Sequence, residues 1–281
     1  MQKNIDLKKV VAINDLCGCG SCSLKIILPV LAAAGLDCLS CPTAILSAHT
    51  AYPAYSFHDM TTELSNYFES WQRLEMDIAA IYSGFLGSVD QIDIISKFID
   101  RQTKTLILID PVMGDHGEAY KTYTPEMCML MRKLAGKADI LTPNLTEAAL
   151  LLNEPYGNRE IDEEQAKVLC HKLHDLGAKN IVLKGVRGPS KQIINYVSQA
   201  NGDWNFIAKP EINCSVFGSG DFFASLLLAS FLRGHSLVEA CDFAADLTGR
   251  AIELSQYYPD HRRRGICCEF FLGEIAAKFV K

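Results

Sequence analysis

The sequence predicts an α/β protein with a central, mostly parallel sheet that is covered by helices on both faces. Short apolar runs alternate with segments of helical spacing along most of the 281 residues, and this alternation is typical of parallel sheets whose crossovers are helices. Two of the apolar runs stop at Pro111 and Pro143, which cannot continue a central strand. Because no linker-like tract, repeat or low-complexity segment divides the chain, we expect one domain over residues 1–281.

The first half of the chain supplies four expected strands and three expected helices. Apolar β-branched runs predict the strands, and apolar residues at three- and four-residue spacing predict the helices. Gly35 is suited to end the first helix as its C-cap. The polar run from Asp15 to Ser23 predicts a loop. In order, the expected elements are a strand at 9–14, a helix at 24–34, a strand at 38–44, a helix at 60–74, a strand at 77–82, a helix at 91–101 and a strand at 105–110.

The second half continues the alternation and ends in helices. Asn201-Gly202 lies between two extended runs and predicts a hairpin turn. Gly177 is placed to end the helix before the next strand. The expected elements are helices at 125–135, 145–152 and 163–176, strands at 139–144 and 180–185, the hairpin strands 192–197 and 203–208, and helices that begin at Ser219, Leu237 and Glu269.

Composition excludes several classes of protein. Hydrophobic residues make up 49% and charged residues 21%, and the formal net charge of −6 argues against a non-specific nucleic-acid binder. The one dense basic run, Arg262-Arg263-Arg264, predicts a solvated turn. No apolar stretch is long enough to cross a membrane, so no membrane partner is expected. Eleven cysteines without secretory features indicate free thiols and a cytoplasmic location.

Gly218-Ser219-Gly220-Asp221, followed by an apolar helix-like run, is the most informative stretch. Glycines let a ligand approach the main chain, and a helix start presents free N–H groups and a positive dipole end to an anion. A carboxylate at the edge of such a site suits a base that takes a proton during phosphoryl transfer. The alternative is an ordinary glycine-rich helix entry with Asp221 in the first turn, where acidic residues are favoured.

The polar ends of the strands point to the same chemistry. Ligands of open parallel sheets bind outside the carboxyl ends of the strands. Asp110 and Glu147 there could hold Mg²⁺ through water, as a nucleoside triphosphate needs. Taken singly, Asp-Pro is a common turn and Glu147 suits a helix start. The strand-end residues are Asn14, Asp15, Ser83, Gly84, Asp110, Thr142, Asn144, Glu147, Lys184 and Gly185.

Five motifs, in order and at family spacing, resemble the ribokinase-like superfamily and within it the pyridoxal and pyridoxamine kinases. They imply a ribokinase-like three-layer α/β/α fold. The pair formed by Asp-Pro-Val-Met-Gly-Asp and Thr-Pro-Asn-x-x-Glu is quite specific to the vitamin-kinase branch, whereas the last motif marks the superfamily. The motifs are Leu46-Ser47-Ala48-His49-Thr50, Tyr82-Ser83-Gly84-Phe85, Asp110-Pro111-Val112-Met113-Gly114-Asp115, Thr142-Pro143-Asn144-Leu145-Thr146-Glu147 and Gly218-Ser219-Gly220-Asp221.

The resemblance implies ATP-dependent phosphorylation of the 5′-hydroxyl of a B6 vitamer, with Asp221 as the general base. Gly218, Ser219 and Gly220 would form the anion hole. The resemblance also implies ATP and Mg²⁺ as cofactors and a homodimer, and it leaves a monovalent-cation requirement open. The implied nucleotide-side residues are Asp110, Asp115, Thr142, Asn144, Glu147 and Lys184, with Asp110 and Glu147 near the metal. The implied substrate-side residues are Asn14, Asp15, Ser47, Thr50 and Phe85, together with Asp221.

A lid is expected over the phosphates. Gly114-Asp115-His116-Gly117 is polar and flanked by glycines, which suits a segment that closes when nucleotide binds. His49 and His116 are candidates for contact with phosphate or substrate.

The sequence departs from the family pattern in four places, of which the first three bear on the substrate rather than on phosphoryl transfer and the fourth keeps the hydroxyl. Asn14-Asp15 stands where pyridoxal kinases commonly have Ser-His, and an Asp there is similar to hydroxymethylpyrimidine kinases. Phe85 replaces a common tyrosine, Lys184-Gly185 replaces two hydroxyl residues, and Ser219 replaces threonine. A hydroxymethylpyrimidine kinase and a catalytically silent ligand-binding relative therefore remain alternatives.

Two Cys-x-x-Cys pairs, Cys19/Cys22 and Cys38/Cys41, formally match the spacing of a structural zinc site. The second pair falls in an expected strand, where residues three apart point to opposite faces. The segment between the pairs also predicts a long apolar helix rather than a zinc-ribbon turn. We therefore expect no zinc in this protein.

Overall fold

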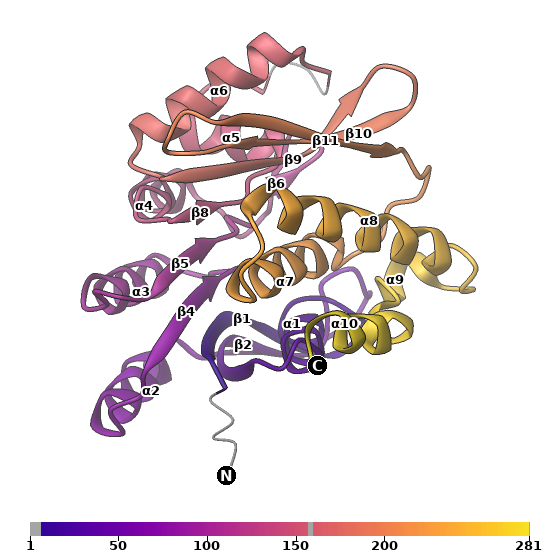
Figure 1. Ribbon diagram of the computed structural model, residues 1–281. Helices are drawn as coiled ribbons and strands as arrows, with labels where there is room; N and C mark the ends of the chain where they lie inside the picture. The colour runs from indigo at the N-terminus through magenta and orange to yellow at the C-terminus, as the bar shows by residue number, and fades with distance from the viewer. Residues whose placement is uncertain (1–6, 157–159, 281) are drawn as a thin grey trace, which may run out of the picture.

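The computed structural model describes residues 7–156 and 160–280, and its framework is one nine-stranded sheet (Figure 1). Its strands, in chain order, are β1 (Lys9–Cys19), β2 (Asp37–Ala48), β3 (Phe57–Asp59), β4 (Ile78–Ser83), β5 (Leu106–Ile109), β8 (Ile140–Leu141), β9 (Asn180–Gly188), β10 (Gln192–Ser198) and β11 (Trp204–Pro210).

The order of the strands across the sheet is β11-β10-β9-β8-β5-β4-β1-β2-β3. The six strands from β9 to β2 run parallel, whereas β3, β10 and β11 pair antiparallel at the edges. From β1 the chain moves outward to β2 and then crosses back to β4, on the other side of β1. This reversal makes the carboxyl ends of β1 and β4 the switch point at which open α/β sheets bind ligands.

Helices cover both faces of the sheet and bury two separate apolar cores. Alternate strand residues point to opposite faces, so Val10 and Ala12 pack in one core and Val11 and Ile13 in the other. One face carries α1 (Leu24–Ala33), α7 (Ser219–Leu232), α8 (Leu237–Ser255) and α10 (Leu272–Phe279). The other face carries α2 (Thr61–Arg73), α3 (Val89–Asp100), α4 (Pro125–Ala135), α5 (Leu145–Leu152) and α6 (Glu163–Asp175).

Four short elements complete the described fold. The two strands β6 (Gly114–Asp115) and β7 (Glu118–Ala119) form a small antiparallel hairpin. α9 (His261–Arg264) is a single helical turn, and the 3₁₀ helix η1 (Cys268–Phe271) leads into α10. Among the described residues, no helix combines the length and the apolar character that a membrane crossing needs.

The predicted α/β/α fold class is confirmed, and most predicted elements lie within two residues of the observed ones. The main correction concerns residues 15–19, which were expected in a loop and instead extend β1. They pair with the equally extended end of β2, with Cys17 opposite Leu46 and Cys19 opposite Ala48, beyond a register shift between Asn14 and Leu16. The extra residue of this bulge lies in β2, where Thr43 and Ala44 stand opposite Asp15 alone.

Five other elements differ from the expectation. The strands β3, β6 and β7 were not predicted, and all three are only two or three residues long. The basic run at 262–264 lies in α9 rather than in a turn; there the Arg264 guanidinium lies 4.7 Å from the ring centroid of Tyr258. The last helix begins as η1, with its α-helical part from Leu272.

Candidate active site

The glycine turn at the start of α7 packs tightly against the loop between β1 and α1. Gly218 is the N-cap of α7 and has a φ of 80°, a left-handed conformation that favours glycine. A Cβ on Gly218 would lie 2.3 Å from the carbonyl oxygen of Ser21, and a Cβ on Gly265 would meet the same oxygen at 2.3 Å. Glycine is therefore required at both positions, and three distant segments of the chain meet at this turn.

Asp221, in the first turn of α7, is held by two neutral donors. The backbone N–H of Ser23 donates to its Oδ2 at 2.7 Å, and the side-chain amide of Asn14 donates to its Oδ1 at 3.2 Å. Asn14 is buried, and its own amide oxygen accepts from the N–H groups of Asp15 and Phe85, both at 3.0 Å. These bonds fix the orientation of the Asp221 carboxylate.

The surroundings of Asp221 raise its pKa from 3.8 to about 7. Burial is the largest cause, because it disfavours the charged form. The Ser23 N–H opposes this shift, while the negative charges of Asp110 and Asp15 add to it. A carboxylate whose pKa lies near neutrality can both accept and release a proton, as a general base must.

Asp110, at the carboxyl end of β5, forms an ion pair with Lys184 on β9. The Asp110 side chain is 2% exposed and that of Lys184 14%. Burial lowers the pKa of Lys184, but the carboxylates of Asp110 and Glu147 more than offset this, so that the pKa lies above its ordinary value. A Cβ on Gly220 would be 3.7 Å from Lys184 Nζ and 3.8 Å from Asp110 Oδ2, which places the pair beside the glycine turn.

Glu147 and Asn144 form a capping box at the start of α5. The N–H of Asn144 donates to Glu147 Oε2 at 2.7 Å, and the N–H of Glu147 donates to Asn144 Oδ1 at 2.9 Å. The N–H of Met113 donates to Glu147 Oε1 at 3.3 Å, and Asn144 Nδ2 donates to the Gly114 carbonyl at 3.0 Å. The box therefore ties the β5–β6 loop to α5.

The pKa of Glu147 is raised from 4.5 to about 8, chiefly by burial. Lys184 opposes this shift and the negative charge of Asp110 adds to it. A cation placed between the carboxylates of Glu147 and Asp110 would favour their ionised forms.

Two buried hydroxyl groups flank Asp110. The Oγ of Ser83 and the Oγ1 of Thr142 lie at the ends of β4 and β8, and neither has a hydrogen-bond partner in the described part of the chain. The Asp110 N–H donates to the Ser83 carbonyl at 2.9 Å, which fixes the two residues side by side. Buried polar groups without a partner are costly. A polar ligand bound beside Asp110 would give these two hydroxyl groups a partner.

The predicted residues do not all meet at one point. The site brings together Asn14, Asp15, Phe85 and Asp221 by hydrogen bonds, and Asp110 with Lys184. Ser47 and Thr50 are exposed at and just beyond the end of β2, where Ser47 Oγ accepts from the N–H of Ser56 at 2.8 Å. Asp115 is exposed on β6, and its side chain accepts from the N–H of His116 at 2.7 Å.

The structure also contains site contacts that the sequence analysis missed. The N–H of Ser23 has no signal in the sequence, because any residue carries one. His49, a candidate ligand, instead bridges protein groups: its Nε2 lies 2.5 Å from the Arg263 carbonyl oxygen, and its Nδ1 accepts from the Ala51 N–H at 3.2 Å. With both ring nitrogens engaged, His49 has a structural role.

Two cavities lie away from these side chains. One, of about 530 Å³, lies at the amino ends of β5, β8 and β9 and is lined by residues such as Lys104, Lys137 and Lys179. The other, of about 610 Å³, lies between α5 and α6. The candidate site is therefore defined by its convergent polar groups at the strand ends.

Comparison with known proteins agrees with this geometry. The family model described as phosphomethylpyrimidine kinase matches residues 28–264. The chain belongs to this kinase family. Its fold is ribokinase-like, and the protein is a kinase.

Solved structures that are similar to this chain include two crystal forms of one bacterial protein. A crystal structure of a putative phosphomethylpyrimidine kinase from Bacteroides thetaiotaomicron is 36% identical, with a TM-score of 0.92 and coverage of 98% of this chain and 96% of that one. A second crystal form of that protein, with a TM-score of 0.91, is described as containing pyridoxal.

Curated relatives come from both vitamin branches. A pyridoxal kinase from Histophilus somni is 28% identical over 236 residues, which are 78% of this chain and 79% of the relative. A hydroxymethylpyrimidine/phosphomethylpyrimidine kinase from Haemophilus influenzae is 30% identical over 183 residues, 63% of this chain and 66% of the relative.

Proposed function

We propose that this kinase transfers the terminal phosphoryl group of ATP to the 5′-hydroxyl of a B6 vitamer, with Asp221 as the general base. The observation that carries this proposal is a carboxylate with a pKa of about 7, oriented by Asn14 and Ser23 beside a glycine turn. The pyridoxal described in the similar Bacteroides structure supports a B6 vitamer as the acceptor.

The phosphate side of the reaction would use the residues around the glycine turn. The N–H groups of Gly218, Ser219 and Gly220 would bind the transferring phosphoryl oxygens, because a helix start favours anions. Lys184 would add a fixed positive charge at the same place, since it lies beside Gly220. Asn144 and Thr142 would line the nucleotide phosphates, and Asp115 on the β6–β7 hairpin would lie in the lid.

The oxygen groups at the carboxyl ends of these strands are suited to bind Mg²⁺. The carboxylates of Asp110 and Glu147 would hold it through water, and the unpartnered hydroxyls of Ser83 and Thr142 supply further oxygens beside Asp110. When bound, Mg²⁺ neutralises phosphate charge. Proton transfer from the acceptor hydroxyl depends on Asp221.

The acceptor side would lie over the end of β1. Asn14 and Asp15 would form its floor, with Phe85 against the ring of the vitamer and with Ser47 and Thr50 at the outer rim. Phe85 is suited to this because its N–H and carbonyl are both fixed, by Asn14 and by Thr43 Oγ1, which leaves the ring to contact an aromatic substrate.

A hydroxymethylpyrimidine is the second candidate substrate. The family description and the Haemophilus influenzae relative favour it, as does the acidic Asp15. The test is a turnover screen with MgATP over pyridoxal, pyridoxamine, pyridoxine and hydroxymethylpyrimidine. We expect the highest kcat/KM with a B6 vitamer. A clear preference for the pyrimidine would assign the protein to the thiamine branch, and no turnover with any of the four would favour a silent relative.

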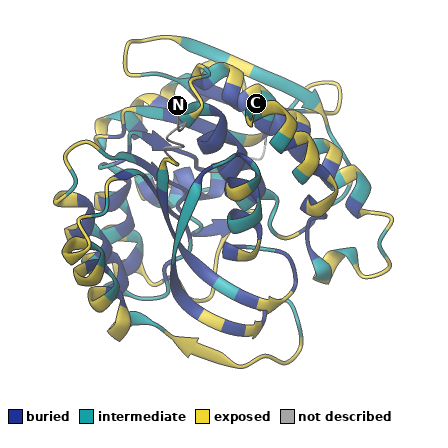
Figure 2. Cartoon of the chain, turned by 60° about the horizontal axis from the view of Figure 1, so that its bottom comes forward, coloured by how far each residue is buried: buried dark blue, intermediate teal, exposed yellow. Residues whose placement is uncertain are grey.

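We further propose a cytoplasmic homodimer. The edge of the sheet at β3 is exposed along its whole length (Figure 2), and Ile45, Tyr55 and Phe57 are 42–51% exposed there. An exposed apolar strand edge is a surface that proteins commonly cover. Light scattering on the purified protein gives the mass in solution, and a monomer at micromolar concentration would contradict this proposal.

A further inference from the structure

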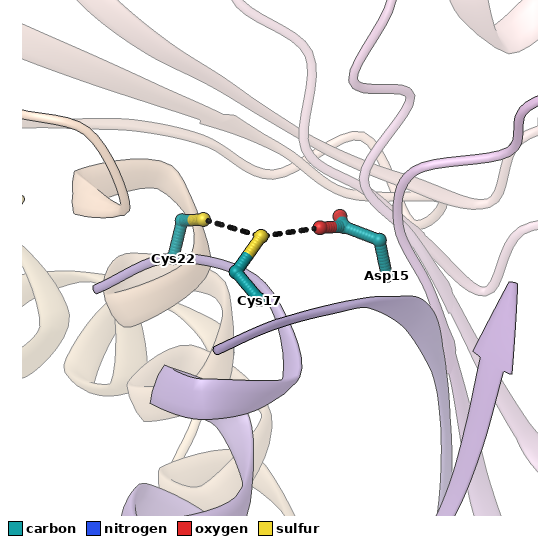
Figure 3. Close-up of side chains that lie close together, drawn as sticks. All are labelled: Asp15, Cys17 and Cys22. Atoms are coloured by element: carbon teal, nitrogen blue, oxygen red, sulfur yellow. Dashed lines mark hydrogen bonds between the residues drawn. The ribbon is translucent and has the colours of Figure 1, made fainter. Parts of the chain in front are cut away.

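Three side chains of metal-ligand type gather where β1 ends and the loop to α1 begins. The Cys17 thiol donates to Asp15 Oδ2 at 3.0 Å, and the Cys22 thiol donates to Cys17 Sγ at 3.6 Å. Figure 3 shows Cys17 between the other two side chains. The three ligand atoms lie within 4.8 Å of one another, and no other such group of three occurs among residues 7–156 and 160–280.

Two of the three spacings between these atoms are close to those around a tetrahedral ion, and the third, between Asp15 and Cys22, is no more than 4.8 Å. Zinc binds thiolate sulfur at about 2.3 Å, so two thiolates on one zinc lie about 3.8 Å apart, and a thiolate and a carboxylate oxygen lie about 3.5 Å apart. The corresponding distances here are 3.6 Å and 3.0 Å. Shifts of about 0.5 Å or less in these two distances would bring both into the coordination range.

The backbone brings Cys22 back toward β1. Gly20 has a φ of 91°, and a Cβ there would lie 2.0 Å from the ring of His49, so the close turn requires glycine. Ser23 follows with a φ of 55°. Asp15 and Cys17 are two residues apart along the strand, the spacing that keeps side chains on one face.

The carboxylate of Asp15 is also oriented from its far side. Ser23 Oγ donates to Asp15 Oδ1 at 2.6 Å, which leaves Oδ2 directed at Cys17. Hydrogen bonds of this kind to the second oxygen of a ligand are a regular feature of protein metal sites.

We propose that Asp15, Cys17 and Cys22 bind one zinc ion. Two thiolates select a thiophilic cation over Mg²⁺ or Ca²⁺. Three protein ligands leave the fourth position of the tetrahedron for water. The site differs from the Cys-x-x-Cys quartet that the spacing suggests, because it replaces Cys19, Cys38 and Cys41 by Asp15 and Cys17. It therefore stands against the expectation of a zinc-free protein.

Zinc in this position would act next to the proposed base. Cys22 precedes Ser23, whose N–H donates to Asp221. An ion bound to Cys22 would hold this donor in place without contacting the phosphoryl group. The zinc site does not depend on the identity of the substrate.

The test uses Co²⁺ as the probe on the full chain, reduced with a phosphine and free of nucleotide. We expect one equivalent of Co²⁺ to give an intense near-ultraviolet sulfur-to-cobalt charge-transfer band that Zn²⁺ abolishes. Asp110 and Glu147 offer only oxygen and cannot produce this band. The readout is therefore separate from the Mg²⁺ site and from kinase activity.

Variants of the loop identify the ligands. Cys17→Ser should lose the band, and Ser23→Ala, which removes only the hydroxyl that orients Asp15, should weaken Co²⁺ binding about 10- to 100-fold. Cys19→Ser is the matched control, because Cys19 is exposed, lies two residues from Cys17 and is outside the group; it should bind like the natural protein. Circular dichroism spectra confirm that each variant is folded.

Several results would overturn the proposal. They are the absence of a charge-transfer band in the natural protein at excess Co²⁺, a band that persists in folded Cys17→Ser, and a band that Cys19→Ser removes. If Cys17→Ser does not fold, Asp15→Asn and Ser23→Ala decide, and unchanged Co²⁺ affinity in both would refute the site.

Discussion

Two carboxylates at the carboxyl ends of the strands have partners of different charge. Asp221 accepts from two neutral groups, the amide of Asn14 and the N–H of Ser23. Asp110 instead contacts the ammonium group of Lys184 inside the protein. Burial raises the pKa of Asp221 to about 7, so this carboxylate can take up a proton near neutral pH, whereas Asp110 lies against the positive charge of Lys184. We call the group around Asp221 the proton-accepting half of the candidate site, and the pair of Asp110 and Lys184 its charge-binding half.

The largest effect that tests this comparison is expected for Asp221→Asn. The amide keeps the shape of the side chain but cannot accept the hydroxyl proton, so kcat should fall about 10²- to 10⁴-fold. The apparent affinity for ATP should change little, because the glycine turn, Lys184 and Asp110 are untouched. Steady-state kinetics with varied ATP measure both quantities.

A structural role for Asp221 predicts a different pattern. Loss of a helix-terminal charge alone would cost about 0.3–1 kcal/mol of stability and leave turnover largely intact. Thermal unfolding on the same preparation separates the two. A near-normal kcat would refute the assignment of Asp221 as the base.

The next largest effect should come from breaking the charge-binding half. Lys184→Met leaves the buried Asp110 carboxylate without its cation, and loss of one partner of a buried pair costs about 3–5 kcal/mol. Urea unfolding measures this loss. The double variant Lys184→Met Asp110→Asn removes both charges and should recover most of the stability but not the turnover. If it stays as unstable as the single variant, the ion pair is not the cause.

The pH dependence of kcat/KM should report the protonation of Asp221 in the proton-accepting half. Protonated Asp221 cannot act as a base, so kcat/KM should rise with pH and level off above a pKa of about 7. Asn14→Ala removes a donor to the charged form and should move this acid limb to higher pH, by up to about one unit, which corresponds to about 1.4 kcal/mol. A limb that stays in place would show that Asn14 does not tune the base.

The smallest effect is expected at the lid. The N–H of Gly117 donates to Thr146 Oγ1 at 2.9 Å, and this hydrogen bond helps to hold the β6–β7 hairpin against α5. Amide exchange over residues 115–123 should slow severalfold when a non-hydrolysable ATP analogue and a vitamer bind together. The exposed turn at Gly202, between β10 and β11, is the control and should not change. Equal exchange with and without ligands would argue against a lid.

Most strands and helices could be predicted from the sequence, because each has a hydrophobic pattern within its own segment. Apolar runs and helical spacing repeat along the chain, and α4 (Pro125–Ala135) and α5 (Leu145–Leu152) begin and end where they were expected. The end of β1 was missed because Cys17 and Cys19 lie in a polar, glycine-rich run without alternation. Its strand form depends on pairing with β2, which no local pattern encodes.

The candidate site, too, combines residues that a local sequence pattern predicts with residues whose contacts depend on tertiary structure. Asp221, Asp110 and Glu147 could be predicted because each follows a strand or opens a helix in a recognisable motif, and Lys184 could be predicted as part of the strand β9. The contacts of Ser23 and Cys17 could not, since Ser23 donates through its main chain and Cys17 contacts Cys22, which the turn at Gly20 brings back toward β1. Motifs predicted the candidate reacting groups, and tertiary contacts determine how those side chains are held.

The meeting of Ser21 with Gly218 and Gly265 has a consequence for how the protein acquires its activity. The hydrogen bond from Ser23 to Asp221 spans 198 residues, and that from Asn14 spans 207. Contacts so distant in sequence are slow to form, because a long loop must close before they contribute. During synthesis the parallel strands from β1 to β9 emerge well before α7. The nascent chain can therefore build most of its sheet while the proposed base is still missing, and the candidate site is completed only near the end of translation.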